Sequence, residues 1–173
     1  MDNCAFPLSA VAALGSLLAA LAAWLAVRET KRASEGQLFL SLFAEYECPE
    51  MLCALRMLRN EAEKGPGFAA EWMKALQASD SVAQEVDRAR RRVQHYFLGA
   101  LRLHEARYAS RRLLRSLCAV DGINILYDVV EPLEAELNKH YDRLAFSTLK
   151  KLCPRSDALV GPVPVPQDDK PGC

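Results

Sequence analysis

The chain has 173 residues, of which 51% are hydrophobic and 25% are charged, so it can form a core and global disorder is excluded. Lys and Arg together number 22, as do Asp and Glu, and the zero net charge argues against a protein built throughout to bind polyanions. Six cysteines are too few for a disulfide-stabilised scaffold. These numbers predict a folded chain of about one domain, and they identify no specific activity.

Residues 5–27 form a run of 23 residues without a charge, AFPLSAVAALGSLLAALAAWLAV. As a helix this run is about 34 Å long, enough to cross a hydrocarbon core of about 30 Å. Its Leu, Val and Phe residues contribute on the order of −3 to −5 kcal/mol toward insertion. We therefore expect an N-terminal transmembrane anchor over residues 1–27.

The charges that flank this run predict its orientation. Asp2 is the only charged side chain before the run, whereas Arg28, Lys31 and Arg32 follow it. The positive-inside rule then places the N-terminus outside and the rest of the chain in the cytoplasm, and we expect a bacterial inner membrane. Two other interpretations stay open. A cleaved secretory signal normally has its positive residues before the run, and the buried helix of a soluble protein is normally shorter.

Small residues recur within the run at a spacing of four. Gly15, Ala19 and Ala23 share one helix face, which would allow two transmembrane helices to approach closely and form a homodimer. An alanine-rich segment also produces this spacing by chance, so an anchor without a partner helix is the alternative.

The pattern after residue 28 is helical, because apolar residues recur every three or four positions and no period-two alternation predicts a strand. The anchor helix is expected to continue through residues 28–46, and Pro49 to open the next helix. Residues 65–67, Gly-Pro-Gly, predict a break before a short helix at 68–78.

Ser79 and Asp80 are expected to cap a long helix that begins at Ser81 and continues into residues 109–120. After Asp121-Gly122, apolar residues from Ile123 to Leu144 form a regular core stripe, with a kink or restart at Pro132.

These elements predict an all-α protein in three parts. A transmembrane helix at 1–27 is followed by a cytoplasmic bundle of about five helices at 28–153. A flexible tail at 154–173 contains five of the nine prolines.

The neutral total conceals a basic helix between two acidic regions. Residues 88–115 carry nine Arg and one Glu, whereas residues 45–87 and 116–173 have net charges of −5 and −3. Three explanations stay open: pairing with acidic neighbours inside the bundle, contact with anionic lipid headgroups, and binding of nucleic acid, the least favoured. The candidate basic surface is Arg88, Arg90, Arg91 and Arg92.

The sequence offers no recognisable catalytic or metal-binding motif. CxxC pairs, GxSxG, phosphate-binding and dinucleotide-binding patterns are absent from it, so we assign no catalytic residue, metal ligand or cofactor. Glu136 and His140 would share a helix face, but the repeated Glu-x-x-His of a di-iron bundle is missing.

We expect a partner to bind beside Pro49 and around Pro132, because helix breaks expose backbone groups. A protein partner or a second copy of the chain is the expected ligand. The candidate partner surface is Tyr46, Glu47, Glu50, Glu131 and Glu134.

Two segments carry a resemblance. EYECPEMLCALRMLRN at 45–60 and NILYDVVEPLEAELNKHYDRLAFSTLKKL at 124–152 resemble segments of uncharacterised bacterial single-pass membrane proteins with a helical cytoplasmic domain of unknown function. The resemblance implies one N-terminal helix and a helical cytoplasmic domain, with no activity attached.

The leading functional interpretation is a membrane-tethered helical interaction or regulatory module. One alternative is a membrane-bound enzyme or a stress or phage-defence effector whose site assembles only in the fold, for which His140 would be buried beside Glu131 or Glu136. The other is a protein that binds a polyanion, nucleic acid or lipid headgroups, through the Arg-rich helix, for which the arginines would face solvent.

Overall fold

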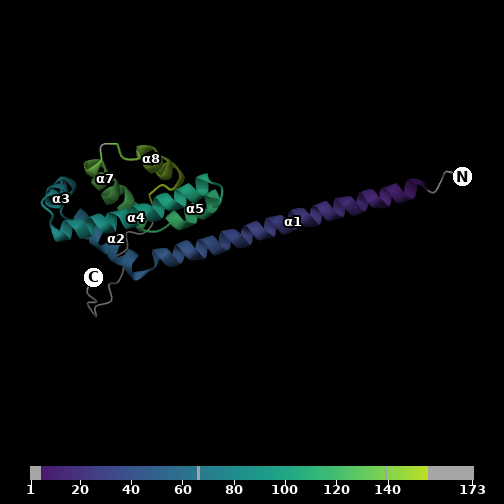
Figure 1. Ribbon diagram of the computed structural model, residues 1–173, viewed down its shortest axis with the longest axis horizontal. Helices are drawn as coiled ribbons and strands as arrows, with labels where there is room; N and C mark the ends of the chain where they lie inside the picture. The colour runs from purple at the N-terminus through teal and green to yellow at the C-terminus, as the bar shows by residue number, and fades with distance from the viewer. Residues whose placement is uncertain (1–4, 66, 139, 156–173) are drawn as a thin grey trace. The chain divides into compact units, whose positions relative to one another are not determined.

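The computed structural model describes residues 5–65, 67–138 and 140–155, with side chains described from Gly15 onward. Within these ranges the regular structure is helical and contains no strand, which confirms the prediction of an all-α protein (Figure 1). The tail expected at 154–173 lies outside the described residues from position 156 on.

The first helix, α1 (Ala5–Tyr46), runs for 42 residues and continues past residue 27 without a break. The chain divides into two compact units, Met1–Leu38 and Phe39–Cys173, so the boundary falls inside this helix. Among the residues that the structure describes, none of the helices combines the length and the apolar character needed to cross a bilayer.

Helix α2 (Pro49–Ala62) begins with Pro49 in its first turn, as predicted, because a proline there sacrifices no intrahelical hydrogen bond. Helix α3 (Phe68–Gln77) follows the predicted break. Gly65 and Gly67 flank this break with φ values of 92° and 99°, a left-handed conformation that glycine adopts without steric cost.

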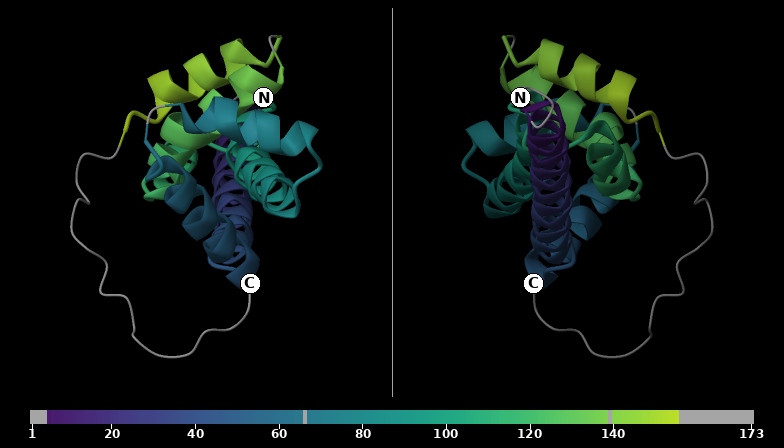
Figure 2. Two further views of the ribbon diagram at one scale, coloured as in Figure 1. Left: turned by 90° about the vertical axis from the view of Figure 1, so that its left-hand side faces the viewer. Right: turned by 90° about the vertical axis from the view of Figure 1, so that its right-hand side faces the viewer.

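Helix α4 (Ser81–Glu105) is the central element of the second unit and packs against α2, α3, α5 and α8 (Figure 2). The Asp80 carboxylate accepts a hydrogen bond from the Ala83 backbone N–H at 2.8 Å, which confirms the predicted start. The buried stripe of α4 includes Val86, Val93, Phe97 and Leu101.

The expected continuation of this helix beyond residue 105 is wrong. Arg107 adopts a left-handed conformation with φ 64°, and the Tyr108 N–H donates to the Leu103 carbonyl at 2.9 Å, which closes α4 in a Schellman motif. A separate helix, α5 (Arg111–Cys118), starts where the Ser110 side chain accepts from the backbone N–H of the third residue of α5 at 3.2 Å. The usual glycine signal for such a stop is missing here.

The next three elements form one continuous helical stretch: α6 (Gly122–Ile125), a π-helical turn η1 (Leu126–Val130) and α7 (Glu131–Leu137). Pro132 lies in the first turn of α7, directly after the wider π-turn, so the helix changes type there and continues without the predicted interruption. The buried positions of this stretch include Ile123, Leu126, Val130 and Leu133.

The predicted core stripe does not extend to Leu144, whose side chain is 76% exposed. Helix α7 ends at Leu137, and α8 (Arg143–Leu152) begins anew with Asp142 as its N-cap. Because α8 has its own helical phase, it buries Phe146 and Leu149 instead.

The left-handed conformation of Arg107 gives a stability prediction. Arg107→Gly should raise the free energy of unfolding by about 1 kcal/mol, because glycine carries no steric cost in this conformation. Arg102→Gly, within the last turn of α4, should lower it by about 1 kcal/mol, because the same change there weakens a regular helix. Urea unfolding measures both, and an equal loss in both variants would contradict the assigned helix end.

Candidate functional site

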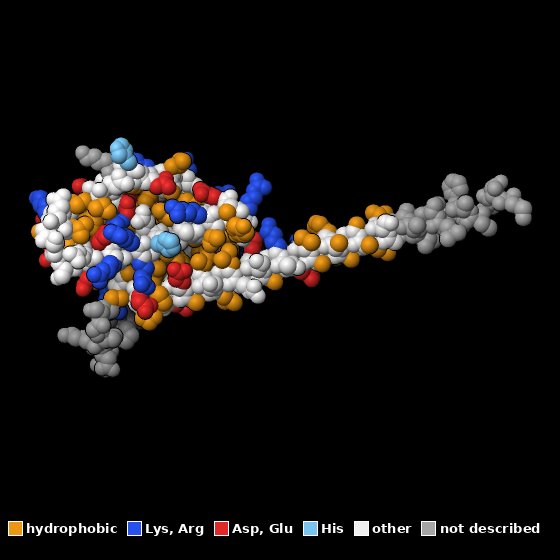
Figure 3. Space-filling model, viewed as in Figure 1, with side chains coloured by type: hydrophobic (Ala, Val, Ile, Leu, Met, Phe, Trp, Pro, Cys, Tyr) orange, Lys and Arg blue, Asp and Glu red, His pale blue; other side chains and the backbone are white. Residues whose placement is uncertain are grey.

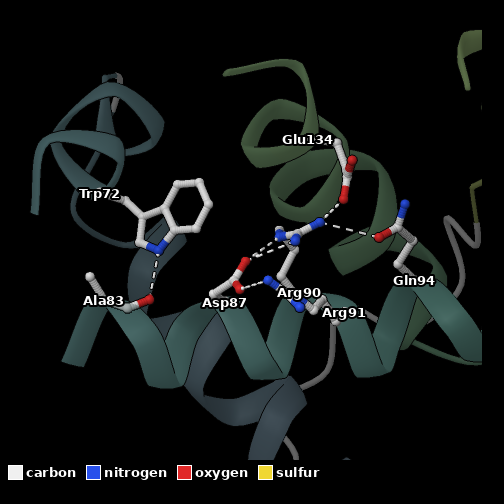
Figure 4. Close-up of polar contacts among 7 residues, drawn as sticks. All are labelled: Trp72, Ala83, Asp87, Arg90, Arg91, Gln94 and Glu134. Carbon is white, nitrogen blue, oxygen red and sulfur yellow. Dashed lines mark hydrogen bonds and ion pairs between the residues drawn. The ribbon is translucent and has the colours of Figure 1, made fainter. Parts of the chain in front are cut away.

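Arg90 on α4 lies in the core, 3% exposed, although it belongs to the expected basic surface. Its Nε and Nη2 donate to Asp87 Oδ1 at 3.0 and 2.8 Å, and its Nη1 donates to Gln94 Oε1 at 3.2 Å (Figure 4). The same Nη1 forms an ion pair with Glu134 of α7. The guanidinium therefore joins two helices that are far apart in the sequence.

The charges of this cluster balance. Arg91 Nη2 lies 2.7 Å from Asp87 Oδ2, so two guanidinium groups meet the two carboxylates of Asp87 and Glu134. A buried charge has a desolvation cost of several kcal/mol, which only well-formed pairs and hydrogen bonds offset. The cluster, which we call the Arg90 network, links α7 to α4, and its groups are already engaged with one another.

The surface predictions for Arg90 and Glu134 are wrong for a reason that the sequence contains. Arg90 follows Val86 by four positions and precedes Val93 and Phe97 by three and seven, so it falls on the buried stripe of α4. Its neighbours fall on other faces of the helix and are exposed: Arg88, Arg91 and Arg92.

The exposed arginines do not form an unbroken basic patch. On the face shown in Figure 3, Lys and Arg side chains alternate with Asp and Glu side chains. Among the exposed arginines of α4, Arg91 is paired with Asp87. Pairing with acidic neighbours therefore accounts for part of the Arg-rich helix, whereas Arg88 and Arg92 remain at the surface.

Glu131 is half-buried and binds groups from the α8 side of the unit. Its Oε2 lies 2.6 Å from Lys150 Nζ, and its Oε1 accepts a hydrogen bond from the Tyr141 hydroxyl at 3.4 Å. In the adjacent π-turn, the Tyr127 hydroxyl donates to the Cys153 carbonyl at 2.8 Å, and burial raises the pKa of Tyr127. These contacts tie η1 and α7 to α8.

Tyr46, the last residue of α1, packs against the core of the second unit. Its ring lies 5.5 Å from that of Tyr96, and its hydroxyl accepts from the Gly122 N–H at 3.1 Å. A side chain at Gly122 would place its Cβ 2.8 Å from this hydroxyl, so the close approach requires glycine. Burial raises the pKa of Tyr46, which acts in packing, whereas Glu47 and Glu50 are exposed.

An open groove of about 460 Å³ lies beside the start of α2, and we call it the Arg92 groove. It is lined by Glu45, Cys48, Met51, Arg91, Arg92 and His95. Arg92 Nη1 donates to Cys48 Sγ at 4.0 Å. The backbone N–H at the start of α2 lowers the pKa of Glu50, and the Cys48 thiol and Arg92 contribute to this shift. Sequence reasoning selected both lining arginines, Arg91 and Arg92, and also Glu50, but it missed the groove itself.

The remaining predicted residues are not brought together into a site. Gly15, Ala19 and Ala23 are exposed on α1, and helix pairing through them stays a prediction. Glu136 and His140 are exposed too, so the buried His that the enzyme alternative called for is not found. Across the described ranges, no three His, Cys, Asp or Glu side chains are placed to hold a metal ion.

One pair of side chains was missed by sequence reasoning because its members are distant in the chain. Cys118 at the end of α5 and Cys153 after α8 are both buried free thiols. Neither lies in a recognisable motif, and only the fold brings α5 and α8 into contact.

Comparison with known protein families, curated proteins and solved structures finds no match to this chain. The functional argument therefore rests on the residues and contacts described above.

The Arg90 network gives the second stability prediction. Arg90→Ala should lower the free energy of unfolding by about 3–5 kcal/mol, because Glu134 would remain buried without its cation. Arg88→Ala removes an exposed arginine from the same helix and should change it by less than about 0.5 kcal/mol. Urea unfolding followed by circular dichroism compares the two, and similar losses would show that the buried pairs do not hold α7.

Proposed function

We propose that this protein is a membrane-tethered helical interaction module. Residues 5–27 anchor it in a bilayer, and the second unit, from Phe39, presents a binding groove on the cytoplasmic side. The observation that carries the tether is the 23-residue run without a charge, together with the exposure of the large apolar side chains in its described part, residues 17–27.

The described part of the run has no face that water would favour. Leu, Val and Trp side chains between positions 17 and 27 are 45–69% exposed, and the residues between them are Ala. A helix that is apolar all round is stable when protein or lipid covers it. Lipid is the cover that we propose, because a run of this length matches the hydrocarbon core.

The charged flank supports the proposed orientation. The Arg28 guanidinium lies 5.4 Å from the ring centre of Trp24, which is 57% exposed. Trp at the end of an apolar run, followed by basic residues, is typical of the cytoplasmic interface of a membrane helix.

The tether is tested by placing a charge in the middle of the run. Leu21→Arg costs roughly 3–4 kcal/mol of insertion free energy, which cancels most of what the apolar residues contribute. We expect the native protein to stay in carbonate-washed membranes and Leu21→Arg to be released. Leu144→Arg, an equally drastic change at an exposed leucine of α8, should leave the protein in the membrane fraction.

Topology is read in the same cells with a membrane-impermeant maleimide. We expect labelling of intact cells that disappears in Cys4→Ser. Release of the native protein by carbonate would contradict the tether. Labelling that survives in Cys4→Ser would contradict the orientation, because it would place another cysteine outside.

The Arg92 groove is the contact surface that we propose for the partner. It combines the exposed guanidinium groups of Arg91 and Arg92 with His95 and an apolar floor at Met51. This chemistry suits a protein segment that presents carboxylates beside an apolar side chain. Because Asp87 already occupies Arg91, the Arg92 guanidinium is the main charge offered to a partner.

Site-specific photocrosslinking tests this surface. A photoreactive phenylalanine analogue in place of His95, an exposed lining residue, should form a covalent adduct with a partner in cells, whereas the same analogue at Leu144 should not. Arg92→Glu, which reverses the main charge offered to the partner, should reduce the adduct several-fold. An adduct of equal yield at both positions, or none at position 95, would overturn the assignment.

A further inference from the structure

Two buried thiols meet where α5 and α8 end. Cys118 is the last residue of α5 and Cys153 directly follows α8, and each side chain is 3% exposed. The two thiols interact, and each shifts the pKa of the other. The Cys153 thiol in turn lies 3.9 Å from the Leu114 carbonyl, one turn before Cys118. Because a helical side chain points back toward the preceding turn, this places the Cys118 sulfur beside Cys153.

The surroundings make the two sulfurs unequal. The interaction with the Cys153 thiol, together with burial, raises the pKa of Cys118 well above its usual range. The Cys118 thiol, with smaller contributions from Arg115 and Arg111, lowers the pKa of Cys153. Arg115 is held in this position, since its Nε donates to the Leu152 carbonyl at 3.3 Å. We assign Cys153, which directly follows α8 beside the Arg115 guanidinium, as the nucleophile and Cys118 as its resolving partner.

We propose that Cys118 and Cys153 form a reversible dithiol–disulfide pair that takes up oxidising equivalents from low-molecular-mass disulfides. The Cys153 thiolate attacks a disulfide RSSR, its S–S bond breaks, and one RS⁻ leaves and takes up a proton. Cys118 then loses its proton, attacks the Cys153 sulfur of the mixed disulfide and displaces the second RS⁻. Two protein thiols are oxidised by two electrons, and one disulfide is reduced to two thiols.

The place of Cys153 in the fold allows access to a buried sulfur. It follows the last turn of α8, where the Tyr127 hydroxyl and Arg115 hold the Cys153 and Leu152 carbonyls. Opening this terminal turn exposes Cys153 while Phe146 and Leu149 keep α8 anchored in the core. The reaction therefore requires a local opening and leaves the central helix α4 in place.

The disulfide would close the segment from residue 118 to 153 into a covalent loop. This segment contains η1 and also Glu134, the partner of Arg90 on α4. Closing a loop of this length restricts the unfolded chain, so oxidation should raise the thermal midpoint by roughly 5–15 °C. The inference does not depend on the membrane anchor.

Peptide mapping of the full-length protein in mild detergent tests the pair. The reduced protein is equilibrated with mixtures of reduced and oxidised glutathione, alkylated and digested with trypsin without reductant. We expect residues 116–139 to appear linked to residues 152–155, in a yield that rises with the oxidised share and vanishes after dithiothreitol. The thermal midpoint should rise in parallel.

Matched variants separate this pair from the other cysteines. Cys48→Ser removes a half-buried free thiol and should keep both the linked peptide and the thermal shift. Cys118→Ser and Cys153→Ser should lose both, and Cys→Ala replaces either serine variant that fails to fold. Absence of the linked peptide from the folded, oxidised native protein would overturn the proposal, as would a thermal shift that persists in the folded Cys118 variant.

Discussion

The second unit depends on how the buried guanidinium of Arg90 is neutralised. Desolvating this charge is costly, and its own helix supplies only part of the compensation, through Asp87 and Gln94. The rest comes from Glu134, so α7, which packs against α3, is also tied to α4 at Arg90. Apolar contacts alone would permit α7 to slide or rotate, because such contacts are non-directional. The ion pair selects one arrangement among those that bury similar apolar area.

The course of the chain around α7 follows from this requirement. Glu134 must reach Arg90 while Val130 and Leu133 stay in the core, and Pro132 between them has no N–H to contribute to the helix. A π-helical turn just before Pro132 changes the helical phase, so Glu134 reaches Arg90 while Val130 and Leu133 stay buried. On the α8 side, Glu131 pairs with Lys150, and the Tyr127 hydroxyl donates to the Cys153 carbonyl. These two contacts hold α8 against η1 and α7.

The sequence predicted helix starts well, because their signals are local: Pro49 and Asp80 act through groups within one turn of their own backbone. It missed the end of α4, because Arg107 takes the left-handed position that glycine usually marks. Arg90 could have been assigned to the core from its spacing to Val93, whereas its pairing with Glu134 could not. The groove and the thiol pair likewise depend on tertiary contacts that a one-dimensional pattern does not contain.

The two units differ in how their apolar side chains are covered, and α1 belongs to both of them. Its side chains from residue 15 to residue 27 are exposed, whereas its last turns supply Tyr46 to the core formed by Tyr96 and Phe97. A hydrophobic helix that its own chain leaves uncovered is costly in water. Covering the helix with lipid removes this cost.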